Sequence, residues 1–468
     1  MIPAQSHRHL ASGGGVPRNS APWWLRFRTF EINLQPRWRS WFFFLGVALC
    51  AALMGGVALR AGYVAILSEA VEVGKVQRAV ELDPANPDLQ HRLGMLLCDS
   101  LAETDRDEGL KHLRRATELD PLEARYWSDL AWVCELSGDT TGALQGVAQA
   151  VKLSPVTPHV HWVAANTLLR LGQTDAALAE FRALLKLDPT YGRATFHVCL
   201  GSFRDPQLIL EKVLPADKDP RLDLAYLNFL LTNGLNDQGR QVWASAVAKG
   251  TSFPPSLAMP YLDNLIGTGR VEDAQSAWRD LQRLGIVSTP AAQEEGNLVF
   301  NGDFEQKPLD DGFDWRSRPV PYMALDVADP NAHTGKFCVR MEFTVSHNDE
   351  FMPLVQFVPV APQQAYLLAA YVRSQDITSD SGPRLQVLDA IHPGNLNAMS
   401  ETTVGTTPWR QISLQFCTGP QTHLVQLAVM RPRGRTFPTE ISGTFWIDTV
   451  AMKSTGPASD GVCNASGH

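Results

Sequence analysis

A short phrase, leucine followed by aspartate or serine and then proline, recurs four times in the first half of the chain. It ends at Pro84, Pro121, Pro155 and Pro189, at intervals of 37, 34 and 34 residues. A period of this length predicts stacked helical hairpins, because one hairpin can bury its apolar face only against its neighbours. Proline separates the hairpins because it cannot continue the backbone hydrogen bonds of a helix. A generic helical bundle is the alternative.

The positions between the prolines agree from one period to the next. One register holds Trp127, Leu130, Ala131, Cys134, Gly138, Ala143, Val147, Ala150 and Pro155, and the next holds His161, Ala164, Ala165, Leu168, Gly172, Ala177, Phe181, Leu184 and Pro189. This pattern resembles the tetratricopeptide repeat, W-x2-L-G-x2-Y, then A-x3-F, then P. Ala131 and Cys134 stand where that family usually has Gly and Tyr. The resemblance implies an α-solenoid that binds a protein partner. The longer first interval predicts a longer turn near Glu103 to Asp107.

Beyond Pro189 the pattern weakens but continues. Gly234 and Gly269 are 35 residues apart, as are Trp243 and Trp278. We therefore expect about four clear repeats up to residue 191 and two or three degenerate ones before about residue 285, since an end repeat must cover the stack.

An uncharged stretch of nineteen residues runs from Trp41 to Leu59. About twenty apolar residues are needed to cross the hydrocarbon of a bilayer, so this stretch predicts a transmembrane helix. Arginines before it favour a cytoplasmic N-terminus. The prediction is a single-pass signal anchor in the inner membrane, with the rest of the chain periplasmic or extracellular. A cleaved signal peptide and a lipoprotein anchor at Cys50 are less consistent with the long leader and with Leu49 before the cysteine.

No linker follows the apolar stretch. Val76 and Ala79 already stand in the repeat phase of Val147 and Ala150. The membrane helix is therefore expected to run directly into the first hairpin and to hold the array close to the bilayer.

From Asn297 onward the apolar period changes from helical to alternating, which is typical of strands. Predicted strands are Lys336–Phe343, Leu354–Val360, Ala365–Arg373, Arg384–Ala390, Arg410–Cys417, His423–Met430 and Gly443–Met452. The predicted fold class is thus multidomain α + β: one transmembrane helix, an α-solenoid, and an antiparallel β-sandwich of the jelly-roll type. The predicted segments are a flexible basic tail (1–40), the anchor (41–67), the repeats (68–287), a linker (288–296), the sandwich (297–453) and a disordered tail (454–468).

The opening Asn297–Glu305 (NLVFNGDFE) and the closing Phe445–Val450 (FWIDTV) resemble those of the carbohydrate-binding-module-like (galactose-binding-like) jelly rolls. Trp315 and Trp409 match core positions of that superfamily. The resemblance spans residues 297–453 and implies a binding module. Related modules often hold a structural calcium ion near the opening motif and the last strand.

The calcium ligands that the resemblance implies are Asp303, Glu305 and Asp448. Hard carboxylate oxygens suit calcium. The alternative is that these side chains cap strand ends. No other cofactor is expected.

Alternation separates the two faces of the predicted strands. Tyr366, Leu368, Ala370 and Val372 point to the core, and Leu385 and Val387 do so by the same count. Related modules bind glycans on the open face of one sheet, which gives the candidates Tyr371, Arg373, Arg384, Gln386 and Gln426. A solvated or protein-contacting face is the alternative.

The first helix of each hairpin should line a concave groove for a protein partner. The groove residues predicted by helical phase are His91, Arg125, Trp132, His159, Trp162 and Asn166. The tryptophans could instead pack between hairpins.

The seven cysteines show no zinc spacing, and a Cys338–Cys417 disulfide and free buried thiols both remain open. The net charge is −8, although residues 1–40 hold six arginines and one acid, so the folded part is acidic and nucleic acid is not expected as a partner.

The sequence contains no G-x-S-x-G, H-E-x-x-H, Walker or dinucleotide-binding motif. The paired acids Asp310 and Asp311 lie in a predicted turn. We therefore predict a non-catalytic, membrane-anchored scaffold, with a protein on its repeats and a glycan or second protein on its sandwich, in exopolysaccharide or envelope assembly. The alternatives are a purely protein-binding scaffold whose sandwich packs on its own repeats, and a glycan-processing enzyme.

Overall fold

The computed structural model describes residues 37–99, 103–289, 296–344, 348–437 and 439–458. Contacts divide the chain into two compact units, residues 1–121 and 122–468, which are described separately below. Most of the predicted basic tail lies outside the described residues, but residues 37–40 are already helical.

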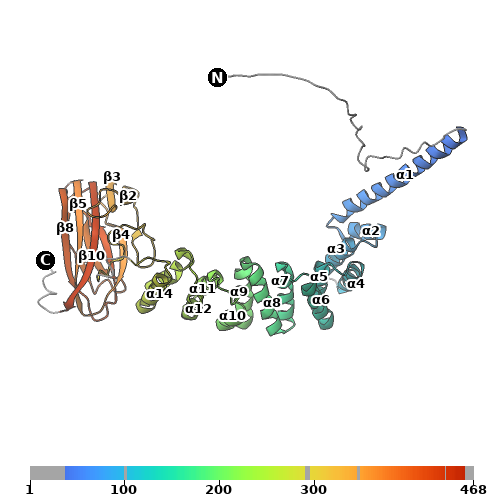
Figure 1. Cartoon of the computed structure of the whole chain (residues 1–468), viewed down its shortest axis with the longest axis horizontal. Coiled ribbons are helices and arrows are strands. Elements are labelled where there is room, and N and C mark those ends of the chain that lie inside the picture. Colours follow the sequence, from blue (N-terminus) through green and yellow to red (C-terminus); the bar gives the residue numbers. More distant parts are fainter. Residues whose placement is uncertain (1–36, 100–102, 290–295, 345–347, 438, 459–468) are drawn as a thin grey trace, which may run out of the picture. The chain divides into compact units, whose positions relative to one another are not determined.

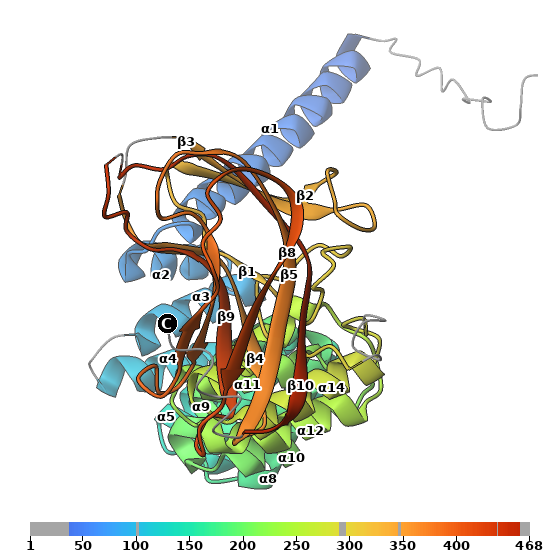
Figure 2. The same ribbon diagram turned by 90° about the vertical axis from the view of Figure 1, so that its left-hand side faces the viewer.

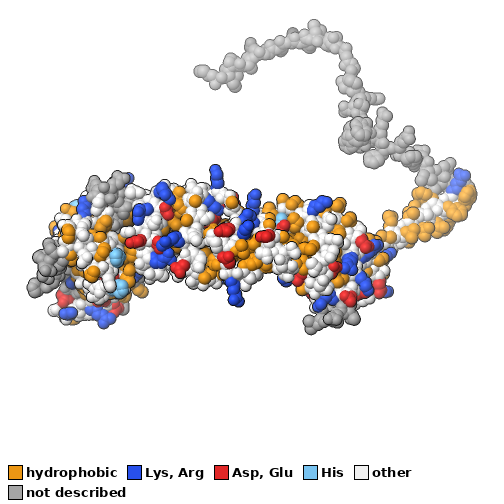
Figure 3. All heavy atoms as spheres, turned by 90° about the horizontal axis from the view of Figure 1, so that it is seen from below, with side chains coloured by type: hydrophobic (Ala, Val, Ile, Leu, Met, Phe, Trp, Pro, Cys, Tyr) orange, Lys and Arg blue, Asp and Glu red, His pale blue; other side chains and the backbone are white. Residues whose placement is uncertain are grey.

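The first unit contains α1 (Arg37–Ser68), α2 (Val73–Leu82), α3 (Pro87–Cys98) and α4 (Glu103–Leu119). Helix α1 is one continuous helix of 32 residues, and its apolar side chains are almost all exposed (Figure 3). A helix this long and apolar could span a membrane. Among the described residues it is the one helix that meets this criterion.

The last turns of α1 pack against the first hairpin. Val64 is buried with Val76, Ala79 and Leu93 in one small core. Arg60 of α1 donates to the carbonyl oxygen of Leu82 at the end of α2. The C-terminal carbonyls of helices attract cations, so this contact fixes the two helices together. The prediction that the apolar helix runs directly into the first hairpin is confirmed.

The predicted long turn near Glu103 to Asp107 is wrong, because these residues form the first turns of α4. Helix α4 has 17 residues, whereas its counterparts α6 and α8 have 14 each. The three extra residues therefore lengthen a helix. Asp105, in the first turn of this helix, is favourable there because it lies near the positive end of the helix dipole.

The second unit begins with further helical hairpins, which Figure 1 shows stacked in chain order. Their helices are α5 (Ala124–Leu136), α6 (Thr140–Leu153), α7 (Pro158–Arg170), α8 (Thr174–Leu187), α9 (Gly192–Phe203), α10 (Pro206–Lys212), α11 (Arg221–Thr232), α12 (Gly239–Ala248), α13 (Met259–Gly267) and α14 (Val271–Arg283). Gly138 and Gly172 turn the chain between paired helices with φ of 78° and 74°, a conformation that favours glycine. Ala143 and Ala177 are fully buried where the paired helices meet.

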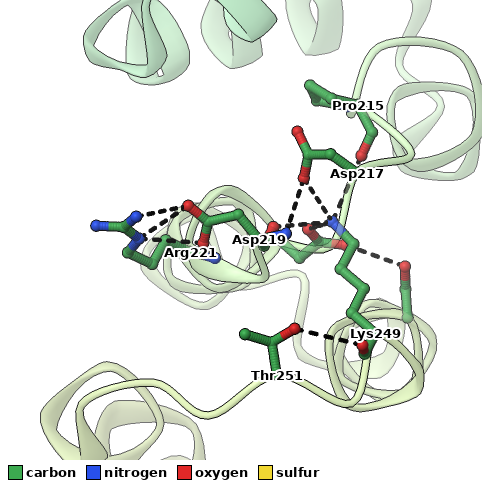
Figure 4. Close-up of polar contacts among 8 residues, drawn as sticks. Pro215, Asp217, Asp219, Arg221, Lys249 and Thr251 are labelled. Atoms are coloured by element: carbon green, nitrogen blue, oxygen red, sulfur yellow. Dashed lines mark hydrogen bonds and ion pairs between the residues drawn. The ribbon is translucent and has the colours of Figure 1, made fainter.

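The irregular loop between α10 and α11 is held by Lys249 from the end of α12 (Figure 4). Its ammonium group forms an ion pair with Asp223 and donates to the carbonyl oxygen of Asp219 at 3.1 Å. The side chain of Asp223 is only 2% exposed, and Ser245 also donates to it. A buried charge is tolerated only when it is paired in this way.

The C-terminal part of the second unit is a sandwich of two five-stranded antiparallel sheets. One sheet has the order β1-β4-β9-β6-β7 and the other β2-β3-β10-β5-β8; Figure 2 shows β5, β8 and β10 side by side. The strands are β1 (Arg316–Ser317), β2 (Met323–Asp329), β3 (Cys338–Thr344), β4 (Phe351–Pro359), β5 (Gln364–Ile377), β6 (Arg384–Asp389), β7 (Asn397–Met399), β8 (Gly405–Cys417), β9 (Leu424–Arg431) and β10 (Ser442–Pro457). The antiparallel sandwich and the helical array are both confirmed.

Some details of the sandwich differ from the predictions. Strands β1, β2 and β7 were not predicted, and β10 continues to Pro457, four residues into the predicted disordered tail. Trp315 is fully buried in the core, as expected, whereas Trp409 is only half-buried and contacts His333 outside it.

The interpretation of Cys338 and Cys417 as a disulfide pair is wrong. Cys338 is a free, buried thiol whose sulfur donates to the carbonyl oxygen of Asp329 at 3.5 Å. Burial raises the pKa of this thiol to about 12. Cys417 is disulfide-bonded. Cys338 and Cys417 lie on β3 and β8, which are separated by β10 and β5 in their sheet, and the sequence did not contain this strand order.

The repeats and the sandwich share one hydrophobic core. Trp278 of α14 meets Phe300 and Phe313 edge-on, at ring-centroid distances of 5.2 and 5.7 Å. Gly312 lies beneath this tryptophan with φ of 60°, and a Cβ atom there would come within 2.5 Å of the indole ring. These contacts fasten the sandwich to the last hairpin.

An ion pair lies beside that core. Arg316 of β1 donates to Asp263 of α13 at 2.6 Å. The carboxyl of Asp311 also faces Asp263, and burial, together with that second acid, raises the pKa of Asp311 to about 6.

Candidate ligand-binding surfaces

The predicted groove residues lie on the first helices of three hairpins. His91 is buried in α3 of the first unit. Arg125 and His159, at the starts of α5 and α7, are both exposed. Trp132 in the middle of α5 is half-buried. The side chains of Arg125 and His159 and part of the Trp132 ring are thus accessible on this part of the array.

The other two groove residues have partners inside the array. Trp162 packs on Phe181 and Tyr191, at ring-centroid distances of 6.1 and 5.7 Å, which places it between hairpins. Asn166 donates to the carbonyl oxygen of Trp162, one turn earlier on its own helix, at 2.8 Å. These two residues therefore contribute to the packing and hydrogen bonding of the array itself.

One ion pair on this face was not predicted. Arg170 of α7 donates to Glu135 of α5 at 2.7 Å, so it bridges two consecutive repeats. The 35-residue separation of these two residues could have signalled the contact, because it is about one repeat period.

The structure does not bring the five predicted glycan-binding residues together. Tyr371 and Arg373 lie on β5, while Arg384, Gln386 and Gln426 lie on β6 and β9 of the other sheet. We call the outer face of the β1-β4-β9-β6-β7 sheet the β6 face and that of the β2-β3-β10-β5-β8 sheet the β5 face. Alternation correctly placed each residue on the face of its sheet that points away from the sandwich core, although Gln386 is buried there. It carries no information on which sheet a strand joins.

The β6 face is built around a row of paired residues. Arg316, Val355, Ala428, Gln386 and Met399 lie directly opposite one another on successive strands. Side chains that are directly opposite share one face of a sheet. The small residues in the middle of the row leave the longer side chains standing at its two sides.

Gln386 has unequal hydrogen bonding at its two ends. It is 3% exposed, and its Nε2 donates to Asn397 Oδ1 at 2.9 Å. Its Oε1 is buried and accepts no hydrogen bond from the described residues. The Nε of Arg384, two residues earlier on the same face, is likewise buried without a partner. Burial lowers the pKa of Arg384.

The β5 face carries an aromatic cluster. The imidazole of His333 stacks on Tyr371 with a ring-centroid distance of 3.7 Å and an interplanar angle of 12°. Trp409 meets the same imidazole at 5.7 Å. Arg373 lies over the ring of Trp446 at 4.8 Å. Sequence reasoning missed His333 because it lies in a loop, where neither period applies.

The predicted calcium ligands accept hydrogen bonds from backbone amides. Glu305 accepts from the amides of Lys336 and Phe337 at 2.5 and 3.0 Å. Asp448 accepts from those of His333 and Thr334 at 2.8 and 2.9 Å, and burial raises its pKa. Amide hydrogens around a carboxylate fit the capping interpretation rather than a cation site.

Within the described ranges, no three His, Cys, Asp or Glu side chains are grouped so that they could hold a metal ion. Asp303 is half-buried in the opening loop. The calcium ion stays a prediction. A melting temperature that is unchanged by a chelator would contradict it.

Comparison with known proteins identifies the helical part. The family model for the tetratricopeptide repeat matches residues 95–158 and 163–198. The chain contains tetratricopeptide repeats. Repeats of this kind mediate protein–protein interactions and are typical of non-catalytic scaffolds. No curated protein sequence matches the chain.

Solved structures are similar to each half of the chain. A structure of MamA (AMB-1) is 20% identical, with a TM-score of 0.26, and covers 30% of this chain and 86% of its own. Pseudomonas aeruginosa PilF is 16% identical, with a TM-score of 0.27, and covers 52% and 98%. A family 4 carbohydrate-binding module (CBM4) is 14% identical, with a TM-score of 0.25, and covers 34% and 99%.

Proposed function

We propose that this protein is a membrane-anchored, non-catalytic scaffold that holds a protein partner on its tetratricopeptide repeats and a glycan chain on the β6 face. The anchor is α1, whose last turns are fixed to the first hairpin. The scaffold would therefore stand at the membrane surface, where envelope or exopolysaccharide assembly takes place.

The unsatisfied Oε1 of Gln386 carries the glycan part of the proposal. Leaving a buried acceptor without a donor costs about 1–3 kcal/mol, so such atoms are rare and usually have a partner. A sugar hydroxyl can donate to Gln386 Oε1 and accept from the Nε of Arg384. Both atoms lie on one strand, two residues apart and on the same face.

The disulfide bond of Cys417 supports a location outside the cytoplasm for the sandwich. Disulfides form and persist in oxidising compartments and are rare in the cytosol. With α1 as a signal anchor and arginines before it, the repeats and the sandwich would lie in the periplasm or outside the cell.

The glycan is tested with the full chain in detergent, by electrophoresis through gels that contain neutral polysaccharides. We expect retardation that weakens about tenfold in Gln386→Ala, which corresponds to about 1.4 kcal/mol. The matched control is Gln411→Ala, an exposed glutamine on β8 of the other sheet. Migration unchanged by every polysaccharide would refute glycan binding on this face.

The protein partner is tested by crosslinking in membranes. Arg125 and Trp132 are accessible on the array, so a double alanine variant should lose its crosslinked partners while the repeats stay helical. A variant that keeps all its partners would exclude this surface.

One observation favours a purely protein-binding scaffold as the second candidate. The sandwich is fastened to the last hairpin through Trp278 and the Arg316–Asp263 ion pair, so it also covers the exposed end of the array. An end repeat needs such a cover. Loss of glycan binding with retention of crosslinked partners would favour this candidate.

A further inference from the structure

A row of charged and aromatic side chains crosses the β5 face. Trp446 on β10 pairs directly with Arg340 on β3 and with Arg373 on β5. The three side chains therefore share the outer face of this sheet. The indole is 6% exposed, and the guanidinium group of Arg373 lies over its ring.

The two arginines differ in their partners. Arg340 forms ion pairs with Asp329 at 3.1 Å and with Glu342 at 2.8 Å. Arg373 forms no ion pair with any acid in the described part of the chain, and its contact is the face of Trp446, 4.8 Å from the ring centroid. One cation on this face is thus neutralised and the other is not.

The indole nitrogen of Trp446 is also unsatisfied. Its N–H is buried and donates to no acceptor among the described residues. A buried donor without an acceptor costs free energy, as a buried acceptor without a donor does. The unpaired guanidinium of Arg373 lies against the same ring, so this part of the face has an excess of donors. A ligand that supplies negatively charged oxygen atoms matches that excess.

An aromatic surface adjoins the donors. Tyr371 lies two residues before Arg373 on the same face, about 7 Å along the strand. His333 stacks on this tyrosine, and the half-buried Trp409 contacts His333. The nearest acid on β10, Asp448, already accepts three backbone amides and so does not compete for the arginine. A flat ring can pack on these aromatics while its charged substituent reaches Arg373.

We propose that the β5 face is a second ligand site, separate from the β6 face, and that it binds an acidic saccharide through the carboxylate of a uronic acid unit. Arg373 pairs with the carboxylate, and the Trp409–His333 surface packs against the apolar face of the sugar ring. The site extends the proposed scaffold function, because a chain with one site on each sheet can hold two glycan segments at once. It does not depend on the β6 face, since it shares no residue with Gln386 or Arg384.

The test uses the full chain in detergent and titrates it calorimetrically with a galacturonate oligomer and with the same oligomer fully methyl-esterified. We expect binding of the acid form at low salt and at least tenfold weaker binding of the ester. Arg373→Gln should weaken binding of the acid form at least tenfold, whereas Arg373→Lys should keep a part of it. Trp409→Ala should weaken it without removing the charge.

The matched control is Arg318→Gln, an exposed arginine in the loop after β1, which should leave binding of the galacturonate oligomer unchanged. Equal affinity for the acid and the ester, or an unaltered affinity in Arg373→Gln, would overturn the proposal. Equal affinity for an acidic peptide of the same charge would overturn its assignment to a saccharide. Circular dichroism melting of each variant shows whether the sandwich remains folded, and Arg373→Lys keeps the charge if Arg373→Gln does not fold.

Discussion

The repeats and the sandwich treat their charged side chains differently. In the repeats, the least exposed charges are paired, as in Lys249 with Asp223 and Glu135 with Arg170. On the sandwich, Arg373 and Arg384 are partly buried without an acidic partner in the described part of the chain. The contrast indicates that buried charge in the repeats serves stability, whereas Arg373 and Arg384 on the sandwich faces are left for the proposed ligands.

Among the variants that test this contrast, Lys249→Ala should lose the most stability. Removing one member of a buried pair leaves Asp223 charged and unpaired, which costs about 3–5 kcal/mol. We expect faster amide hydrogen exchange throughout α11 and α12, where the loss of local stability would be measured. Lys218→Ala, at an exposed lysine in the loop between α10 and α11, is the control and should change little. Exchange equally slow in both variants would mean that the pair does not stabilise the array.

The junction between the repeats and the sandwich should lose almost as much stability when Trp278 is replaced. Trp278→Ala removes a buried indole that contacts Phe300 and Phe313, and substitutions of this kind cost about 3–5 kcal/mol when the cavity does not collapse. The sandwich should then separate from α14, and protease should cut between them. Arg279→Ala, an exposed neighbour on the same helix, is the control. Resistance to protease in Trp278→Ala would show that the ion pair of Arg316 is sufficient.

The pH dependence of the junction is a smaller effect. The pKa of Asp311 is raised to about 6 in the folded state, first by burial and then by its contact with Asp263. The folded state therefore binds a proton that the unfolded state has released between about pH 4 and pH 6, so stability falls as pH rises through that interval. Burial raises the pKa of Asp314 to about 6 as well, which acts with the same sign.

The free energy of unfolding of the second unit should therefore have a component that decreases between about pH 4 and pH 6, on the order of 1 kcal/mol because solvent screens a partly exposed group. The melting temperature should decrease over the same interval. Asp311→Asn should reduce that component, and Asp175→Asn, an exposed acid on α8, should not. An Asp311→Asn variant with the pH profile of the native protein would remove Asp311 from the explanation.

The sequence predicted the parts of this molecule that depend on local periodicity. Gly138 and Gly172 marked turns that need positive φ, and alternation placed Tyr371 and Arg373 outside the sandwich core. It did not predict which sheet a strand joins, because β5 and β6 are consecutive in the chain but belong to different sheets. For this reason the residues predicted for one glycan site lie on two separate surfaces.

The remaining errors have similar physical causes. The superfamily resemblance assigned Trp409 to the core, whereas alternation along β8 from the buried Ile412 and Leu414 places it on the outer face, where the structure has it. The donors and acceptors left unsatisfied at Trp446 and Gln386 depend on contacts between strands, and no single segment of sequence contains them.

Gln386→Leu has the smallest expected change in stability. It distinguishes most clearly between a role of Gln386 in ligand binding and a role in stabilising the fold. If the glutamine served the fold, its loss would cost stability, as with Lys249. Its Oε1 has no donor among the described residues, so an apolar side chain of similar size removes an unsatisfied atom and forfeits one hydrogen bond to Asn397. The net change in the free energy of unfolding should be within about 1 kcal/mol of zero. Glycan retention should nevertheless fall by about tenfold.

The control is Gln426→Leu, on the same face but with its amide against the sulfur of Met352. A Gln386→Leu variant that melts well below the native protein yet still binds glycan would show that Gln386 stabilises the fold and does not bind the glycan.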